Sequence, residues 1–181
     1  MSRVIVKSAV VAVASLALVA GSGPAFAAQT KRVIEDPVEP GNAYDIVKVV
    51  MKSQKTKTGK AKVTVTHGRQ VQVGDSIDVW FNLDKDAQPE IHLTGDSFSE
   101  YAVFQTTSFT EDGKDISNRG CMSLQMVRAK SKVKFDPKCL KAGPTFAVSV
   151  KSSRSDQPAD TADYVPAPEK FTKRVLSGPL A

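Results

Sequence analysis

Residues 71–90 read VQVGDSIDVWFNLDKDAQPE and contain the most regular alternation of apolar and polar side chains in the chain. A period of two places alternate residues on opposite faces of a strand. One face is apolar and the other is polar apart from a single Trp, which predicts an antiparallel strand with one face in the core. The two sets are Ile77, Val79, Phe81 and Leu83, and Ser76, Asp78, Trp80 and Asn82.

Similar short runs lie on both sides of this strand and are separated by turn clusters such as Asp112-Gly113. About eight short strands without helical periodicity predict an all-β antiparallel β-sandwich, with immunoglobulin-like or jelly-roll-like connectivity. The remaining strand candidates are residues 44–51, 61–66, 91–93, 101–107, 121–128, 132–135 and 146–151. The expected core is Ile77, Val79, Phe81, Val133, Phe135, Phe146, Val148 and Val150.

Residues 1–27 have the features of a secretory signal peptide. Arg3 and Lys7 precede a short apolar run, and Ala25-Phe26-Ala27 fits a small-x-small cleavage site before Ala28. The apolar run is too short to span ~30 Å of hydrocarbon comfortably. We therefore expect a secreted, extracellular protein that can associate with the cell wall and has no membrane span after cleavage.

The remaining chain divides by composition into a spacer at 28–42, a sandwich domain at 43–152 and an extended tail at 153–181 that packs on the domain. The full chain carries 25 Lys and Arg against 19 Asp and Glu, a formal charge of +6. Removal of the two basic residues of the signal peptide leaves 23 against 19, or +4. This mild excess is not typical of a nucleic-acid-binding protein.

Cys121 and Cys139 are the only cysteines. An even count in an exported chain predicts a disulfide between them. The alternatives are a metal pair or a catalytic thiol. Two Cys without a nearby His supply too few ligands for zinc, and a thiol nucleophile needs a base.

The loop after the central strand is rich in carboxylates. Asn82, Asp84 and Asp86 lie at alternate positions, and Glu90 follows. Their side chains carry the oxygen atoms that calcium prefers, so these four residues are the candidate calcium ligands. Lys85 lies inside the loop, and the glycine and glutamate of an EF-hand are missing. We predict no tight metal site and no cofactor, and the alternative role of the loop is an acidic turn that solvates the end of a hairpin.

Two Gly-Asp-Ser triplets, at 74–76 and 95–97, begin like a motif of serine hydrolases. The chain has no Asp-x-x-His and no histidine after His92, and it lacks the alternating helices of that fold. We therefore predict that the protein is not an enzyme; a secreted hydrolase is a disfavoured alternative, since isolated carboxylates can act as acid and base.

Lysines gather in two hairpin regions of the sequence. If these regions are neighbours in the fold, they form a basic face that attracts polyanions such as cell-wall teichoic acids. Lysines that line solvated strand faces and protect sheet edges are the alternative. Base stacking is disfavoured because the one aromatic residue, Phe135, belongs to the core. The clusters are Lys52, Lys55, Lys57, Lys60 and Lys62, and Arg128, Lys130, Lys132, Lys134, Lys138 and Lys141.

Trp80, on the polar face of its strand, is a candidate ligand contact. With Tyr101 and Tyr164 it would form a stacking platform for a glycan. The alternative is a Trp covered by a loop or by the C-terminal tail. The predicted function is a secreted, non-catalytic binding or structural module at the cell envelope, with an anionic wall polymer or a glycan as partner and a carbohydrate-binding module as the alternative.

Several segments together resemble small secreted β-sandwich proteins of actinobacteria, a group without an assigned activity. They are the signal peptide, Tyr44-Asp45-Ile46, residues 79–84 before Pro89-Glu90, Cys121 with Cys139-Leu140, residues 163–166 and residues 171–175. The resemblance covers most of the mature chain and implies a fold but no functional residue. Asn82 departs from the Asp expected in the acidic loop, which weakens the calcium hypothesis further.

Overall fold

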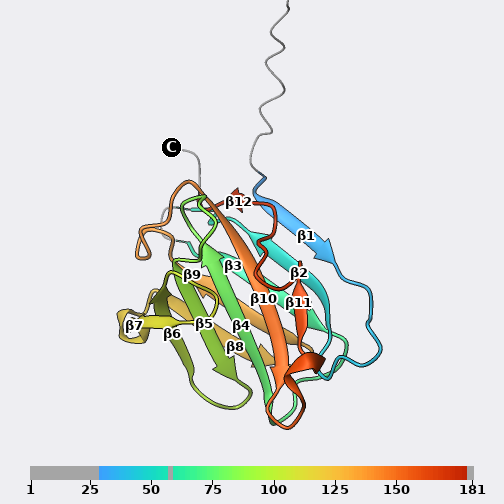
Figure 1. The fold of residues 1–181 in the computed structure, drawn as a ribbon. Coiled ribbons are helices and arrows are strands. Elements are labelled where there is room, and N and C mark those ends of the chain that lie inside the picture. Colours follow the sequence, from blue (N-terminus) through green and yellow to red (C-terminus); the bar gives the residue numbers. More distant parts are fainter. Residues whose placement is uncertain (1–28, 57–58, 179–181) are drawn as a thin grey trace, which may run out of the picture.

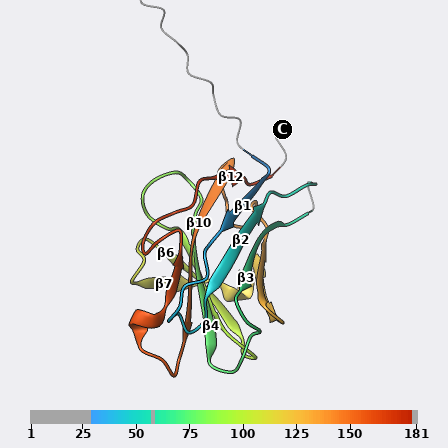
Figure 2. The ribbon, with the colours of Figure 1, turned by 90° about the vertical axis from the view of Figure 1, so that its right-hand side faces the viewer.

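The computed structural model describes residues 29–56 and 59–178. These residues form twelve strands in two antiparallel sheets. Figure 2 shows the sheets as two layers, with β2 and β3 in one and β4 and β10 in the other. The predicted all-β antiparallel sandwich is confirmed, with more strands than the about eight expected from sequence.

The smaller sheet has five strands and includes the N-terminal one. In spatial order it contains β1 (Lys31–Glu35), β2 (Ile46–Lys52), β3 (Ala61–His67), β9 (Lys130–Phe135) and β8 (Met122–Val127). The larger sheet lies in front of it in Figure 1. Its order is β11 (Asp163–Val165), β10 (Thr145–Arg154), β4 (Asp75–Asn82), β5 (Ile91–Asp96), β6 (Tyr101–Thr106) and β7 (Asp112–Asp115), and β12 (Val175–Leu176) also pairs with β10. Two 3-10 turns, Ser117–Arg119 and Ala159–Thr161, complete the described elements.

β4, the strand within residues 71–90, lies in the middle of the larger sheet. β4 pairs with β10 on one side and with β5 on the other. Its apolar face meets the five-stranded sheet, and rings from both sheets interlock there, with Phe135 edge-on to Phe81 at 5.1 Å and to Phe146 at 4.9 Å. All eight residues of the expected core have an exposed fraction of 0%.

The ends of the sandwich contain strands that the composition did not reveal. The prediction of a spacer at 28–42 is wrong for Lys31–Glu35, because β1 pairs along its whole length with β2. This segment has five residues, of which three are charged, so its sequence pattern did not identify a strand. In the fold, however, Ile34 packs against the core. β10 ends at Arg154, and β11 and β12 in the segment that follows it both pair with β10.

The disulfide between Cys121 and Cys139 is confirmed, with their Cα atoms 5.5 Å apart. It joins the start of β8 to the turn that follows β9. The pairing that matters most for the surface is a different one, between β3 and β9. Because these strands are distant in the sequence, their pairing brings the two lysine-rich regions together.

Candidate functional site

Four lysines form one row across four neighbouring strands of the five-stranded sheet. Lys31 on β1 lies opposite Lys52 on β2, and Lys52 lies opposite Lys62 on β3. Lys62 in turn lies opposite Lys134 on β9. Strands are spaced by ~4.8 Å, so the row is ~14 Å long. The residues that alternate with these lysines face the core, which places all four ammonium groups on the outer face.

The whole outer face of this sheet is basic. Its three cross-strand rows place seven lysines and one glutamate at outward positions. That surplus of six positive charges exceeds the +4 that the chain carries without residues 1–27 (23 Lys and Arg against 19 Asp and Glu), so the basic excess is concentrated on this one face. The charged residues are Lys31, Lys48, Lys52, Lys62, Lys130, Lys132, Lys134 and Glu35.

The row has no internal neutralisation. Lys48 pairs with Glu35 at 3.0 Å, but within residues 29–56 and 59–178 none of the four lysines in the row has a carboxylate within ion-pair distance. Like charges directly opposite each other in a sheet are destabilising. The row therefore lowers the stability of the isolated protein, and an anion bound across it would relieve this repulsion.

The basic face is hollowed at its centre. An open groove of about 500 Å³ is lined by β2 and β3 together with Glu35 of β1 and Lys130 of β9. Lys48, Lys52, Thr64 and Thr66 are also among its lining residues. The ammonium groups and hydroxyls of these residues are hydrogen-bond donors for an anionic chain lying along the face, and Glu35 is paired with Lys48.

The lysine clusters found in the sequence thus meet, although not all their members lie on this face. Lys138 and Lys141 follow β9 in a turn, and Lys57 lies outside the described residues. Sequence reasoning missed Lys31, because it was assigned to a spacer. It also left Lys48 out of the clusters, because this lysine lies inside the apolar run of Ile46–Lys52. The sequence of Lys31–Glu35 has no regular alternation of apolar and polar residues that could have identified the strand.

Trp80 is not available as a stacking platform. It is 7% exposed and stacks on His92, with ring centroids 4.6 Å apart and planes 3° apart. Phe109, from the loop before β7, covers it at 5.7 Å and in turn contacts Phe171 of the C-terminal segment. The structure therefore agrees with the alternative interpretation, in which Trp80 is covered by a loop or by the C-terminal tail. Tyr101, opposite Gly95, packs toward the core, and the three aromatic residues do not form one surface.

His92 is held between two carboxylates, an arrangement that the sequence did not indicate. Its Nδ1 lies 2.6 Å from Asp112 Oδ1, and its Nε2 lies 3.2 Å from Asp78 Oδ1. Burial lowers the pKa of His92, but the hydrogen bonds to Asp78 and Asp112 outweigh burial and raise the pKa above its usual value. Both ring nitrogens are engaged, so His92 has no free nitrogen with which to take a proton from a nucleophile.

His67 has a hydroxyl neighbour but no access to substrate. Its Nε2 lies 2.9 Å from Ser131 Oγ, the contact expected of a base and a nucleophile. His67 is 3% exposed and Ser131 is fully buried, and Tyr44 stacks on the imidazole at 3.8 Å. Burial lowers the pKa of His67 to about 3. The pair is a neutral hydrogen bond inside the sandwich.

The Gly-Asp-Ser triplets lie where strands begin or end, the first at the start of β4 and the second at the end of β5. Asp75 is fully buried and accepts two hydrogen bonds from Arg69, at 2.6 and 2.7 Å. Ser76 Oγ lies 2.8 Å from Ser153 Oγ, and Ser97 Oγ donates to the carbonyl of Gln72 at 2.5 Å. Each hydroxyl is engaged by the protein itself.

The acidic loop does converge. Carboxylate oxygens of Asp84, Asp86 and Glu90 lie within 4.8 Å of one another. Asn82 does not join them, because its amide nitrogen donates to the carbonyls of Asp86 and Gln88, at 2.6 and 3.0 Å, while its Oδ1 accepts from the backbone of Lys85 at 3.1 Å. The absence of a tight calcium site stays a prediction.

A cation of the protein already lies beside this loop. The guanidinium of Arg174 donates to Oδ1 and to the carbonyl of Asn82. Burial, together with the neighbouring Asp84, raises the pKa of Glu90 to about 7, although the N–H of Leu83 opposes this shift. The guanidinium of Arg174 therefore already offsets part of the negative charge of this cluster.

Among the described residues, no helix has the length and apolar character needed to cross a membrane. Comparison with known proteins found no family model that matches the chain. It also found no curated protein whose sequence matches it.

Proposed function

We propose that this protein is a secreted, non-catalytic binding module that holds an anionic polymer of the cell envelope on the outer face of its five-stranded sheet. The row formed by Lys31, Lys52, Lys62 and Lys134 is the observation that carries the proposal. Lysines distributed only for solubility would alternate with acids across strands, whereas these four lie opposite one another without a carboxylate partner among the described residues.

The geometry suits an extended polyanion better than a single small anion. Cationic groups recur at ~4.8 Å along a line of ~14 Å, and two further rows widen the positive surface. A chain with negative charges at regular intervals contacts several lysines at once, and each added contact raises the effective concentration for the next. The strands are already ordered in the free protein, so binding costs little conformational entropy of the backbone.

Other classes of function find less support in the described residues. A neutral glycan needs an exposed aromatic ring, and Trp80 is covered by Phe109. Nucleic acid binding without sequence preference uses aromatic stacking, and the outward positions of the basic face contain no aromatic residue. Hydrolysis needs an accessible nucleophile and base, and His67 with Ser131 is buried.

The test is retention of the purified protein on isolated cell wall at low and at high salt. A face variant, Lys52→Gln with Lys62→Gln and Lys134→Gln, removes three charges from the row. We expect retention of this variant to fall by roughly tenfold at low salt, since three exposed contacts contribute roughly 0.5 kcal/mol each. Binding of the parent protein should decline steeply as salt screens the charges.

The matched control removes three lysines elsewhere, Lys114→Gln with Lys170→Gln and Lys173→Gln. Lys114 lies on β7 in the other sheet, and the other two lie in the C-terminal segment. The net charge change is the same, so the control should be retained like the parent protein. Equal losses in the two variants, or retention that does not depend on salt, would refute the proposal.

A further inference from the structure

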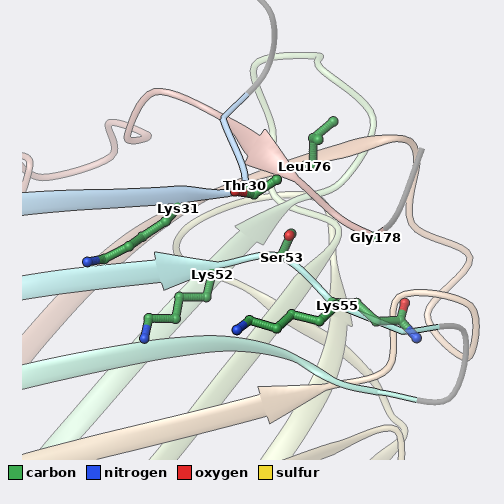
Figure 3. A pocket seen from close by; sticks show the side chains of 8 residues that line it. Thr30, Lys31, Lys52, Ser53, Lys55, Leu176 and Gly178 are labelled. Atoms are coloured by element: carbon green, nitrogen blue, oxygen red, sulfur yellow. The ribbon is translucent and has the colours of Figure 1, made fainter.

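A pocket lies at one end of the lysine row. Its volume is about 520 Å³, within the range of roughly 300–1,000 Å³ typical of small-molecule sites. Three segments form it: the start of β1, the residues that follow β2, and the chain after β12. Figure 3 shows the side chains of Lys31, Lys52 and Lys55 around this space, with Leu176 on another side.

Backbone hydrogen bonds fix the walls of the pocket to one another. The N–H of Ser53 donates to the carbonyl of Thr30 at 2.8 Å, which joins the first two segments. The N–H of Gln54 donates to the carbonyl of Ser177 at 3.1 Å, which joins the second segment to the third. The pocket is therefore formed before a ligand arrives, and binding does not have to order its walls.

The lining combines basic, hydroxyl and apolar residues. Lys31, Lys52 and Lys55 are its charged members, and it contains no carboxylate. Within the described parts of the chain these lysines have no ion-pair partner. Thr30 and Ser53 add hydroxyls, and Leu176 adds an apolar wall.

We propose that this pocket binds a phosphate monoester carried on a short polyol or alkyl chain. Such a group carries a charge of about −1.5 to −2 at neutral pH and has three strong acceptor oxygens. It therefore matches three ammonium groups better than a carboxylate with a single charge. The carbon chain of the ester lies against Leu176.

The inference rests on the proposed function in one respect: Lys52 belongs both to the pocket and to the row, so a polymer on the basic face can end in the pocket. A phosphate monoester is found at the end of a phosphate-containing polymer and also in free phosphorylated polyols. The site chemistry is the same for both sources, and the experiment separates them.

The direct test is a titration of the isotope-labelled protein with glycerol 3-phosphate, followed by amide chemical shifts. We expect saturable shifts at Thr30, Ser53, Lys55 and Gly178. Inorganic phosphate should bind several-fold more weakly, because it lacks the carbon chain, and glycerol should cause no shift. Equal affinities for glycerol 3-phosphate and phosphate, or shifts spread over the sheet without saturation, would overturn the inference.

Two single variants with the same charge change sharpen this test. Lys55→Gln lies in the pocket but outside the row, and should weaken glycerol 3-phosphate binding roughly fivefold. Lys114→Gln lies on β7 in the other sheet, outside both the pocket and the row, and should leave that affinity unchanged. Equal weakening by both variants would show a diffuse charge effect and refute a pocket.

Cell-wall retention distinguishes the two proposals and the two sources. If isolated cell wall retains the protein through the lysine row but glycerol 3-phosphate never binds, the inference fails and the proposed function stands. If glycerol 3-phosphate binds in the pocket but isolated cell wall does not retain the protein, the proposed function fails and the ligand is a free phosphate monoester. Displacement of wall-bound protein by glycerol 3-phosphate, lost in Lys55→Gln, supports the polymer end as the ligand.

Discussion

His92 shows how a residue with no informative sequence context acquires a defined state in the fold. Asp78 and Asp112 hold its two ring nitrogens, and Trp80 stacks on its ring. Asp112 belongs to the edge strand β7, next to the loop that carries Phe109. A protonated His92 therefore ties the edge of the sheet to its centre and keeps Trp80 covered.

The His92→Gln variant tests this interaction through pH dependence. The folded-state pKa of His92 is raised, so its contribution to stability is complete below the unfolded-state value of about 6.5 and disappears as pH rises through the folded-state pKa. We expect the variant to lose about 1–2 kcal/mol near pH 6 and progressively less at higher pH. Thermal melts of both proteins between pH 6 and 9 measure this, and a constant difference would contradict it.

The acidic loop leads to a second prediction at the scale of residues. Arg174 lies beside Asp84, Asp86 and Glu90, and one carboxyl of the cluster has a pKa of about 7. We expect no calcium-dependent rise in Tm. A site occupied 100-fold above its Kd would stabilise the fold by about 2.7 kcal/mol, which a melt detects easily. A rise of that size in the parent protein, absent in Asp84→Ala, would contradict the prediction.

Strand pairing, at the scale of elements, creates the row of lysines and its cost in stability. Lys62 has a lysine opposite it on both sides, Lys52 on β2 and Lys134 on β9. We expect Lys62→Gln to raise the free energy of unfolding by up to about 1 kcal/mol at low salt, since two like-charge contacts are removed. The gain should vanish in high salt. Denaturant unfolding at two salt concentrations measures it, with Lys114→Gln as the control.

The hairpin of β8 and β9 is closed by the disulfide between Cys121 and Cys139. Cross-linking residues separated by 18 positions removes about 3 kcal/mol of conformational freedom from the unfolded chain. We expect Cys139→Ala to lower the free energy of unfolding by about 2–5 kcal/mol. The parent protein treated with a reductant should lose the same amount, and an unchanged Tm would contradict the expectation.

The molecule as a whole has two different faces. The five-stranded sheet presents the lysine row, while the outer face of the larger sheet carries the cluster of Trp80, His92 and two aspartates, covered by Phe109. We therefore expect an anionic surface to attract the basic face rather than the opposite face.

Export is the prediction that belongs to the whole chain. Residues 1–27, assigned from sequence to a signal peptide, lie outside the described residues. We expect the intact mass of the protein recovered from culture medium to correspond to a chain that begins at Ala28. A secreted species that retains residues 1–20 would show that the assignment is wrong. The disulfide is compatible with an oxidising compartment.

The sequence by itself determined the fold class, the core and the disulfide. Each depends on local information: a period of two within one strand predicts which of its side chains are buried, as Ile77, Val79 and Phe81 are. An even count of cysteines, in a chain for which the sequence predicts export, predicts a bond between them. None of these inferences requires knowing which strands are neighbours.

Only the tertiary structure decided where the charges gather. Lys62 and Lys134 lie opposite each other because β3 pairs with β9, and Lys31 joins the row because β1 pairs with β2. Which segments pair depends on the packing of two complete sheets, and a shift of one residue would turn every lysine of a strand toward the core. Register between distant strands is a property of the whole fold, and so is the basic face that it creates.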